Sequence, residues 1–266
     1  MHADIQTYLH SFEFESPYAE PVTLAHLLTH TSGIVDPPYM GNTDPAAVQP
    51  LAEFLEANLP SPTHPPGEVN SYSNYGYALA GLIVEETSGV SFDEYVRTNI
   101  FQPLQMSRSS YLITPQLTTE MTTGYLYQDG QQIPQPREYD SDYPGGSIIS
   151  TAEDMSHFLV AHLQEGCYEG ECILSFDTIA AMHTKQAQTS YEGQNMTYGF
   201  VEGFDDGVRL IGHSGAARGY GSSLNIFPDY DMGYFFCFNA WCYETSACQI
   251  IPEFRQAFVE RFMLAE

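Results

Sequence analysis

The sequence predicts an α+β fold in which helices come first and an antiparallel sheet comes last. Three observations carry this prediction. Helical spacing and helix-end signals recur up to about residue 166, short β-type segments separated by turn residues begin near Thr197, and one amphipathic segment closes the chain. Helices segregated from a meander are typical of this class. We therefore expect one domain over residues 1–266, with a mostly helical lobe over 1–196 and strands with a terminal helix over 197–266.

Helices are expected first at Val22 to His30, where apolar residues recur with helical spacing before Ser32 and Gly33. A longer helix is expected at Asn74 to Ser88, because its apolar pattern stops at Gly89 and glycine favours helix ends.

Two further helix starts are expected from the spacing of capping boxes. Ser91 with Glu94 predicts a helix that begins at Phe92. Thr151 with Asp154 predicts one that begins at Ala152 and stops at Gly166.

Strands are expected where the period changes after Thr197. The predicted strands are Tyr198 to Gly203, Val208 to Ser214, Ser222 to Phe227 and Met232 to Asn239. Turn residues separate them at short intervals, which predicts an antiparallel meander. We expect the last helix, roughly Ile250 to Met263, to cover this sheet.

Composition excludes some classes of partner. The formal net charge is -26, from 34 acidic and eight basic residues, and lysine occurs only at Lys185. Nucleic acids and anionic membrane surfaces are disfavoured, because both bind through clustered Lys and Arg. This acidity fits salt adaptation, or an acidic surface that only aids solubility. No apolar run approaches the roughly 20 residues of a membrane span, and no signal peptide is visible.

The five cysteines form two groups. Cys167 and Cys172 bracket a short turn that a disulfide could close, and such a bridge would indicate an oxidising compartment. The odd fifth cysteine weakens that inference. Neither group has the pattern of a zinc site, so we expect no metal and no cofactor.

Three sets of residues are candidates for chemistry. Ser214 lies between glycines after a strand, as in a nucleophile elbow, but His213 is the last histidine and none follows to complete a triad. His26 and His30 share a helix face, yet the zinc-protease pattern needs a glutamate where Leu27 stands.

The third candidate is Tyr72 with Asn74, behind a Pro-Pro-Gly turn at the start of the long helix. A tyrosine and an amide held by one backbone turn can act as proton carrier and hydrogen-bond clamp beside a nucleophile. Taken alone, a packed aromatic residue and a helix N-cap explain both positions as well.

Five sequence blocks in a fixed order extend this third candidate through almost the whole chain. The chain resembles the serine β-lactamase and penicillin-binding-protein superfamily, specifically its class C β-lactamase-like branch of esterases and D-aminopeptidases. The blocks are Val22 to Ile34 (VTLAHLLTHTSGI), Pro66 to Gly89 (PGEVNSYSNYGYALAGLIVEETSG), Ile100 to Met106 (IFQPLQM), Gly145 to Phe158 (GGSIISTAEDMSHF) and Gly212 to Asn239, which ends in FFCFN.

The resemblance implies a β-lactamase/transpeptidase-like fold and acyl transfer on a small ester, amide or peptide substrate. Tyr72 would shuttle the proton and Asn74 would bind the substrate or a lysine. His213, Ser214 and Gly215 would replace a Lys-Thr-Gly strand motif. The backbone N–H of Ala216 would be an oxyanion donor.

Arg218 is a further candidate, since its guanidinium could bind a substrate carboxylate. A solvated loop arginine is the competing interpretation. The resemblance also implies an extracellular or periplasmic location, whereas the oligomeric state is not predicted.

The sequence departs from the family at its first motif. No Ser-x-x-Lys exists in these 266 residues, because Met182 stands three positions before the single lysine. We therefore expect an N-terminally truncated and inactive catalytic domain whose nucleophile helix lies upstream of Asp4. His213 in place of lysine favours an esterase or peptidase over a β-lactamase. The alternative is a non-catalytic homologue that binds peptide or cell-wall ligands.

Overall fold

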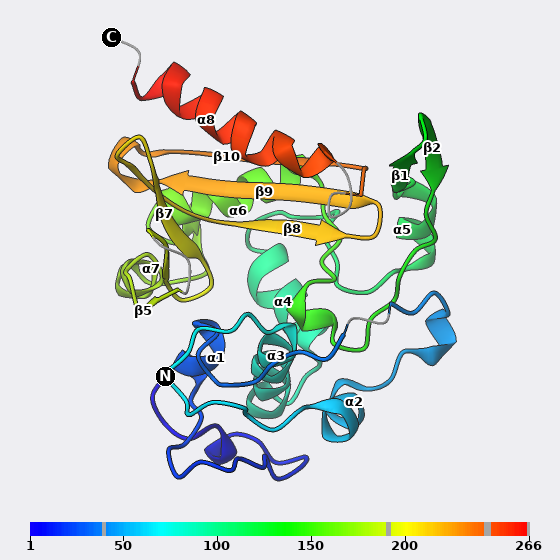
Figure 1. Cartoon of the computed structure of the whole chain (residues 1–266), viewed down its shortest axis with the longest axis vertical. Coiled ribbons are helices and arrows are strands. Elements are labelled where there is room, and N and C mark those ends of the chain that lie inside the picture. Colours follow the sequence, from blue (N-terminus) through cyan, green and yellow to red (C-terminus); the bar gives the residue numbers. More distant parts are fainter. Residues whose placement is uncertain (39–40, 190–192, 242–245, 265–266) are drawn as a thin grey trace.

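An antiparallel sheet of six strands organises the computed structural model, which describes residues 1–38, 41–189, 193–241 and 246–264. Its strand order is β10-β9-β8-β7-β6-β5, so each strand lies beside its neighbour in sequence (Figure 1). The strands are β5 (Ala187–Gln188), β6 (Asn195–Met196), β7 (Val201–Asp205), β8 (Val208–Ala217), β9 (Tyr220–Phe227) and β10 (Met232–Phe238).

The meander predicted from the sequence is confirmed, because all neighbouring strands pair antiparallel. The sheet begins earlier than expected, at Ala187. Strands β5 and β6 have two residues each, and so short a segment carries no measurable alternation of apolar and polar residues. The prediction also placed β7 about three residues too early.

Helices cover both faces of the sheet. On one face, α6 (Ala152–Leu163) packs Leu159 against Ile211 and Ile226. On the other, α8 (Ile250–Phe262) packs Val259 against Leu210 and its neighbours. The expectation that the terminal helix covers the sheet is therefore confirmed, and α8 lies along it in Figure 1.

The remaining elements form the helical part of the chain, drawn below and beside the sheet in Figure 1. Its helices are α1 (Leu24–Leu28), α2 (Leu51–Asn58), α3 (Asn74–Ser88), α4 (Phe92–Val96), α5 (Pro115–Glu120) and α7 (Phe176–Met182). This part also contains two β-hairpins. In one, β1 (Tyr125–Gln128) pairs with β2 (Gln131–Pro134), and in the other, β3 (Cys167–Tyr168) pairs with β4 (Glu171–Cys172).

Helix α3 has the bounds that the sequence predicts. Ser73 caps it by accepting a hydrogen bond from the N–H of Gly76, and it ends at Gly89 with a φ of 75°. Glycine adopts this left-handed conformation without a steric penalty, which explains the stop. The cap is Ser73 rather than Asn74, so the reading of Asn74 as a mere N-cap is wrong.

The other helix predictions need correction at their ends. Helix α1 spans only Leu24–Leu28, because His30 has a φ of 55° and so cannot continue the helix. Helix α6 begins at Ala152 as predicted but ends at Leu163, before Gly166. Helix α4 also begins as predicted, although the Ser91 side chain makes no capping hydrogen bond.

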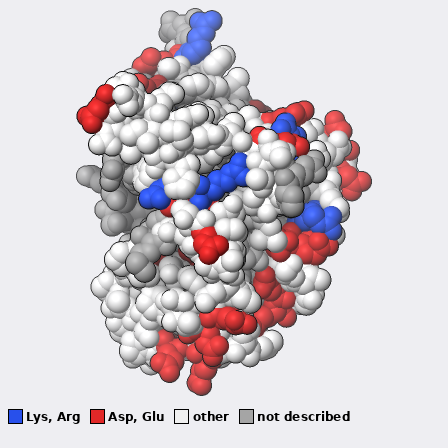
Figure 2. Space-filling view, turned by 90° about the vertical axis from the view of Figure 1, so that its right-hand side faces the viewer, with Lys and Arg blue, Asp and Glu red and all other residues white. Residues whose placement is uncertain are grey.

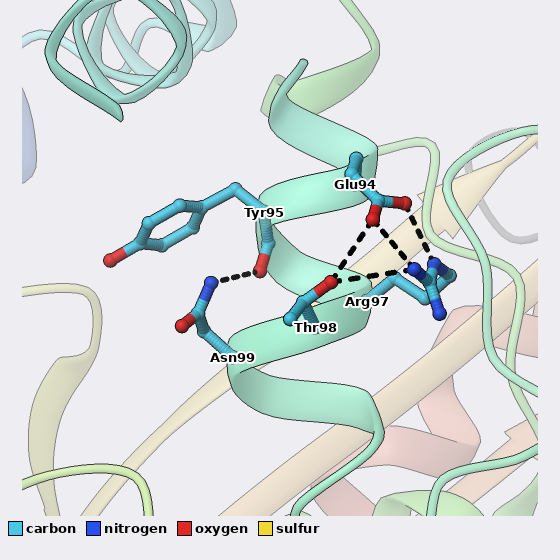
Figure 3. A network of polar contacts seen from close by, with 5 residues as sticks. All are labelled: Glu94, Tyr95, Arg97, Thr98 and Asn99. Carbon is cyan, nitrogen blue, oxygen red and sulfur yellow. Dashed lines mark hydrogen bonds and ion pairs between the residues drawn. The ribbon is translucent and has the colours of Figure 1, made fainter. Parts of the chain in front are cut away.

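Helix α4 continues into a π-helical turn, Arg97–Phe101, whose outer side carries a small polar network (Figure 3). The Arg97 guanidinium donates to both carboxylate oxygens of Glu94, at 2.8 and 2.6 Å. Both side chains are nearly half exposed, and exposed pairs of this kind contribute little to stability. The network thus belongs to the solvated surface rather than to a site.

The sequence left open whether Cys167 and Cys172 are bridged, and the structure joins them by a disulfide that closes the β3–β4 hairpin. Charged groups are unevenly spread over the face shown in Figure 2, where Lys and Arg side chains lie across the middle and acidic side chains dominate below.

Within the described ranges, the structure holds no helix with the length and apolar character of a transmembrane span.

Candidate active site

The loop that carries Tyr72 is fastened to the segment after α1. The N–H of Gly67 donates to the Thr31 carbonyl at 2.7 Å, and the N–H of Ser71 donates to the His30 carbonyl at 2.7 Å. The Asn70 side chain donates to a further carbonyl of that segment, at 2.9 Å. We call residues 29–36 and 70–75 together the helical wall.

Asp36 holds the start of α3 in place. Its carboxylate accepts from the Ser73 hydroxyl at 2.6 Å, from the Asn74 N–H at 2.6 Å and from the Tyr75 N–H at 3.2 Å. Hydrogen bonds to a charged acceptor are stronger than neutral ones, and a carboxylate also suits the positive end of a helix dipole. Asp36 therefore fixes the backbone that positions both Tyr72 and Asn74.

His30 forms the floor beneath Tyr72. Its side chain is 3% exposed, and its Nδ1 accepts from the Ser73 N–H at 3.1 Å. The His30 and Tyr72 rings lie 4.3 Å apart between centroids. Burial, and then the proximity of His213, lower the pKa of His30 to about 4. His30 is therefore neutral at physiological pH.

Tyr72 is where the two halves of the site meet. Its ring is 53% exposed, and its centroid lies 6.1 Å from that of His213 on β8. Asn74, the first residue of α3, packs closely against Gly145, where an added Cβ would lie 2.8 Å from the Asn74 carbonyl oxygen. Tyr72 and Asn74 thus lie at one helix start, as expected.

Strand β8 supplies the opposite side through residues His213–Arg218, which we call the strand wall. Pairing with β7 ends at Val201↔Gly212, whereas pairing with β9 continues to Ala217↔Tyr220. In the described part of the chain, residues 213–217 therefore have a paired neighbour on one side only. We call this stretch the open edge of β8.

The predicted strand residues alternate in direction along this edge. Successive side chains of a strand point to opposite faces, so His213 and Gly215 share one face while Ser214 and Ala216 share the other. The structure thus brings His213, not the Ser214 side chain, toward Tyr72. Nearby protein atoms displace part of the water around His213 and lower its pKa, although the residue itself is exposed.

Arg218 follows the strand and is already engaged. Its Nε lies 3.2 Å from a carboxylate oxygen of Glu138, and its guanidinium lies 5.1 Å from the centroid of the Trp241 ring. The side chains are 33% exposed for Arg218 and 9% for Glu138. Arg218 is thus not the solvated loop arginine of the competing interpretation.

Sequence reasoning missed Asp36 and Glu138 as parts of this site, and it considered His30 as a metal ligand or, as the favoured alternative, as part of a helix end. His26 and His30 in fact accept hydrogen bonds from backbone N–H groups, at Thr23 and Ser73. Asp36 and Glu138 act through partners 37 and 80 positions away, and no local motif marks such pairs.

Among the described residues, no cluster of three or more His, Cys, Asp or Glu side chains could hold a metal ion.

Comparison with known proteins identifies the family of this chain. A family model described as Beta-lactamase matches residues 1–249. The chain belongs to the beta-lactamase family. Its fold is the β-lactamase/transpeptidase-like fold, as the resemblance implied.

Two relatives of this beta-lactamase-family chain are penicillin-binding proteins. Penicillin-binding protein 4 of Amycolatopsis lactamdurans is 32% identical over 226 residues, which cover 80% of this chain and 58% of the relative. Penicillin-binding protein 4* of Bacillus subtilis (strain 168) is 27% identical over 237 residues, covering 80% of this chain and 50% of the relative. The chain thus spans only about half the length of these curated relatives.

Solved structures of penicillin-binding proteins share the fold of this beta-lactamase-family chain. An octameric penicillin-binding protein homologue from Pyrococcus abyssi superposes with a TM-score of 0.79 at 26% identity, covering 98% of this chain and 59% of that one. A penicillin-binding protein from Bacillus halodurans superposes with a TM-score of 0.76 at 26% identity, covering 97% of this chain and 77% of that one.

Proposed function

We propose that this chain carries the tyrosine–asparagine part and the strand part of an acyl-transfer site, in a β-lactamase-related serine hydrolase of the esterase or D-peptidase type. The observation that carries the proposal is the position of Tyr72 beside His213, with ring centroids 6.1 Å apart, at the open edge of β8. The substrate class is a small ester, amide or peptide.

The open edge supports an extended ligand. Unpaired backbone N–H and C=O groups on a strand edge bind an extended peptide or acyl chain as an added strand. A chain bound along residues 213–217 lies between β8 and the helical wall, with Tyr72 beside it. The N–H of Ala216 is the proposed oxyanion donor, and Asn74 is the proposed polar clamp.

We further propose that these 266 residues alone do not turn over an acyl substrate. They contain no Ser-x-x-Lys, so they offer no nucleophile of the kind that the resemblance implies. A tyrosine works as a proton acceptor only when nearby positive charge favours the phenolate. The two imidazoles beside Tyr72, His30 and His213, both have lowered pKa values and are neutral at pH 7.

Hydrolysis of p-nitrophenyl butyrate tests this proposal. We expect no turnover above that of a Tyr72→Phe variant, and no covalent adduct after incubation with a fluorophosphonate or a penicillin probe. Mass spectrometry of the intact chain and its peptides is the readout. A probe-labelled residue would contradict the claim of inactivity and would identify the nucleophile.

The open edge also fits a second function, a non-catalytic homologue that binds peptide or cell-wall ligands. The coding sequence upstream of Met1 distinguishes the hydrolase from the binding protein. A Ser-x-x-Lys found there supports the hydrolase. An N-terminal region of the family's usual kind without that motif supports the binding protein.

A further inference from the structure

We propose that His30 is a positioning residue for Tyr72: it holds the backbone on both sides of Tyr72 and supports the phenol ring beside His213. In this role His30 exchanges no proton and acts through Tyr72. The inference rests on the proposed function, because it names what places the proton carrier of that site.

The first argument is the backbone around Tyr72. The His30 carbonyl accepts a hydrogen bond from the N–H of Ser71 at 2.7 Å, and the His30 Nδ1 accepts one from the N–H of Ser73 at 3.1 Å. These two donors belong to the residues directly before and after Tyr72. One residue therefore fixes the backbone from which the Tyr72 side chain projects.

The second argument is the support of the phenol ring. The His30 ring lies 4.3 Å from the Tyr72 ring and 4.9 Å from the Tyr77 ring, between centroids. Aromatic rings at such distances attract each other. The Tyr77 hydroxyl is bound to the Leu28 carbonyl at 2.9 Å, and the His30 side chain is buried. The exposed Tyr72 ring thus rests on a support that is itself fixed by its surroundings.

The third argument is the protonation state of the imidazole. A backbone N–H can only donate, so the Nδ1 of His30 keeps its lone pair, and the neutral ring carries its hydrogen on Nε2. Protonation of Nδ1 would break the bond to Ser73, which is buried. Burial and then His213 lower the pKa of His30 to about 4, in agreement with this state. His30 therefore does not take the proton that Tyr72 would carry.

The fourth argument is the backbone angle of His30. Its φ of 55° lies in the left-handed region, which is unfavourable for residues other than glycine. Backbone conformations of this kind persist where the surrounding structure fixes them, and they cluster at functional sites. At this angle both the carbonyl and the ring of His30 reach the segment that carries Tyr72. Glycine would avoid the strain but would offer no imidazole.

NMR spectroscopy of the whole chain at neutral pH tests the geometry. We expect His30 to be the Nε2–H tautomer, with a scalar coupling across the hydrogen bond between its Nδ1 and the Ser73 amide nitrogen. We also expect a nuclear Overhauser effect (NOE) between the Tyr72 and His213 rings. A His30 ring protonated on Nδ1 would overturn the inference.

Two variants separate the parts of the support. His30→Asn tolerates the positive φ and offers a side-chain oxygen to the Ser73 N–H, but it has no ring. His30→Gly tolerates the angle and removes both the acceptor and the ring. The matched control is His26→Asn, because the Nδ1 of His26 also accepts a backbone N–H, from Thr23 at 3.3 Å.

Both His30 variants should lose the NOE between Tyr72 and His213. His30→Gly should also exchange the Ser73 amide hydrogen about tenfold faster than the wild type, the order of one lost hydrogen bond. His26→Asn should leave both signals unchanged. An undiminished NOE in His30→Asn would show that the ring does not position Tyr72, and the inference would be wrong.

A ligand titration links this geometry to the proposed function. N-acetyl-D-phenylalaninamide is the probe, followed through the Tyr72 and His213 side-chain signals. We expect both His30 variants to bind it about fivefold more weakly than the wild type, and His26→Asn to bind it equally well. Equal affinity of the wild type and His30→Asn contradicts the inference and leaves the proposed function standing. If the probe perturbs neither ring in the wild type, the proposed function fails, while the tautomer and the NOE still decide whether His30 positions Tyr72.

Discussion

The helical wall and the strand wall face each other across the site but are built in opposite ways. In the helical wall, apart from the exposed Tyr72, polar side chains are buried or half-buried and hydrogen-bonded, as for His30 at 3% exposed and the half-buried Asp36 with three hydrogen bonds. In the strand wall, His213, Ser214 and Ala216 are exposed, and the backbone of residues 213–217 is paired on one side only. The helical wall is preorganised by the fold, whereas in the proposed function the strand wall is completed by a bound ligand.

The largest effect that this contrast predicts is at Asp36. Asp36→Ala removes the acceptor for three donors at the start of α3, and we expect it to lower the free energy of unfolding by about 3–4 kcal/mol. Urea denaturation followed by circular dichroism measures the change.

Asp44→Ala is the matched control for Asp36. Asp44 caps the three-residue turn Pro45–Ala47 and accepts one exposed hydrogen bond, from the N–H of Ala46 at 2.9 Å. Its loss should cost about 1 kcal/mol or less. Equal effects of the two substitutions would show that Asp36 is one more surface cap and that the helical wall is not specially stabilised.

Acidification should destabilise the helical wall next most strongly. His30 has a folded pKa of about 4, below its usual 6.5, so the unfolded chain binds more protons between these values. The stability that His30 contributes is complete above pH 6.5 and is lost as the pH falls toward 4, by roughly 3 kcal/mol.

The variant His30→Asn isolates this contribution, because asparagine tolerates the positive φ at this position. The fall in unfolding free energy from pH 6.5 to 4 should be smaller in His30→Asn than in the wild type. His64→Asn, at an exposed position, should keep the wild-type pH dependence. A pH dependence shared by all three proteins would assign the acid sensitivity to other groups, such as the hydrogen-bonded pair of the buried His162 and the half-buried His183.

The smallest expected effects distinguish the part of β8 that is paired on both sides from its open edge. A Cβ at Gly212 would lie 2.2 Å from the Leu224 carbonyl oxygen, which the sheet holds in place. A Cβ at Gly215 would meet the Ser222 hydroxyl at 2.5 Å, and that side chain can rotate away. We expect Gly212→Ala to cost about 2 kcal/mol and Gly215→Ala less than about 1 kcal/mol in urea denaturation. The reverse order would mean that the open edge is as tightly packed as the paired part.

Sequence reasoning was most successful where a local pattern has a local cause. Helix α3 was predicted with its bounds, because apolar spacing and a glycine stop are readable without tertiary context. The proximity of Tyr72 and His213 was predicted from the order of the family motifs and not from periodicity. Asp36, Glu138 and the short α1 were missed because each depends on a partner distant in sequence or on a backbone angle that residue type does not fix.

The open edge of β8 has an evolutionary consequence. Where a ligand is held by main-chain groups, the side chains of that strand can change over generations while the docking geometry survives. His213 can thus occupy a position where the resemblance implies lysine, without rebuilding the strand. Selection on charge then passes to residues beside the strand, so relatives of this chain should diverge in ligand preference through exchanges next to β8 sooner than through changes in the fold.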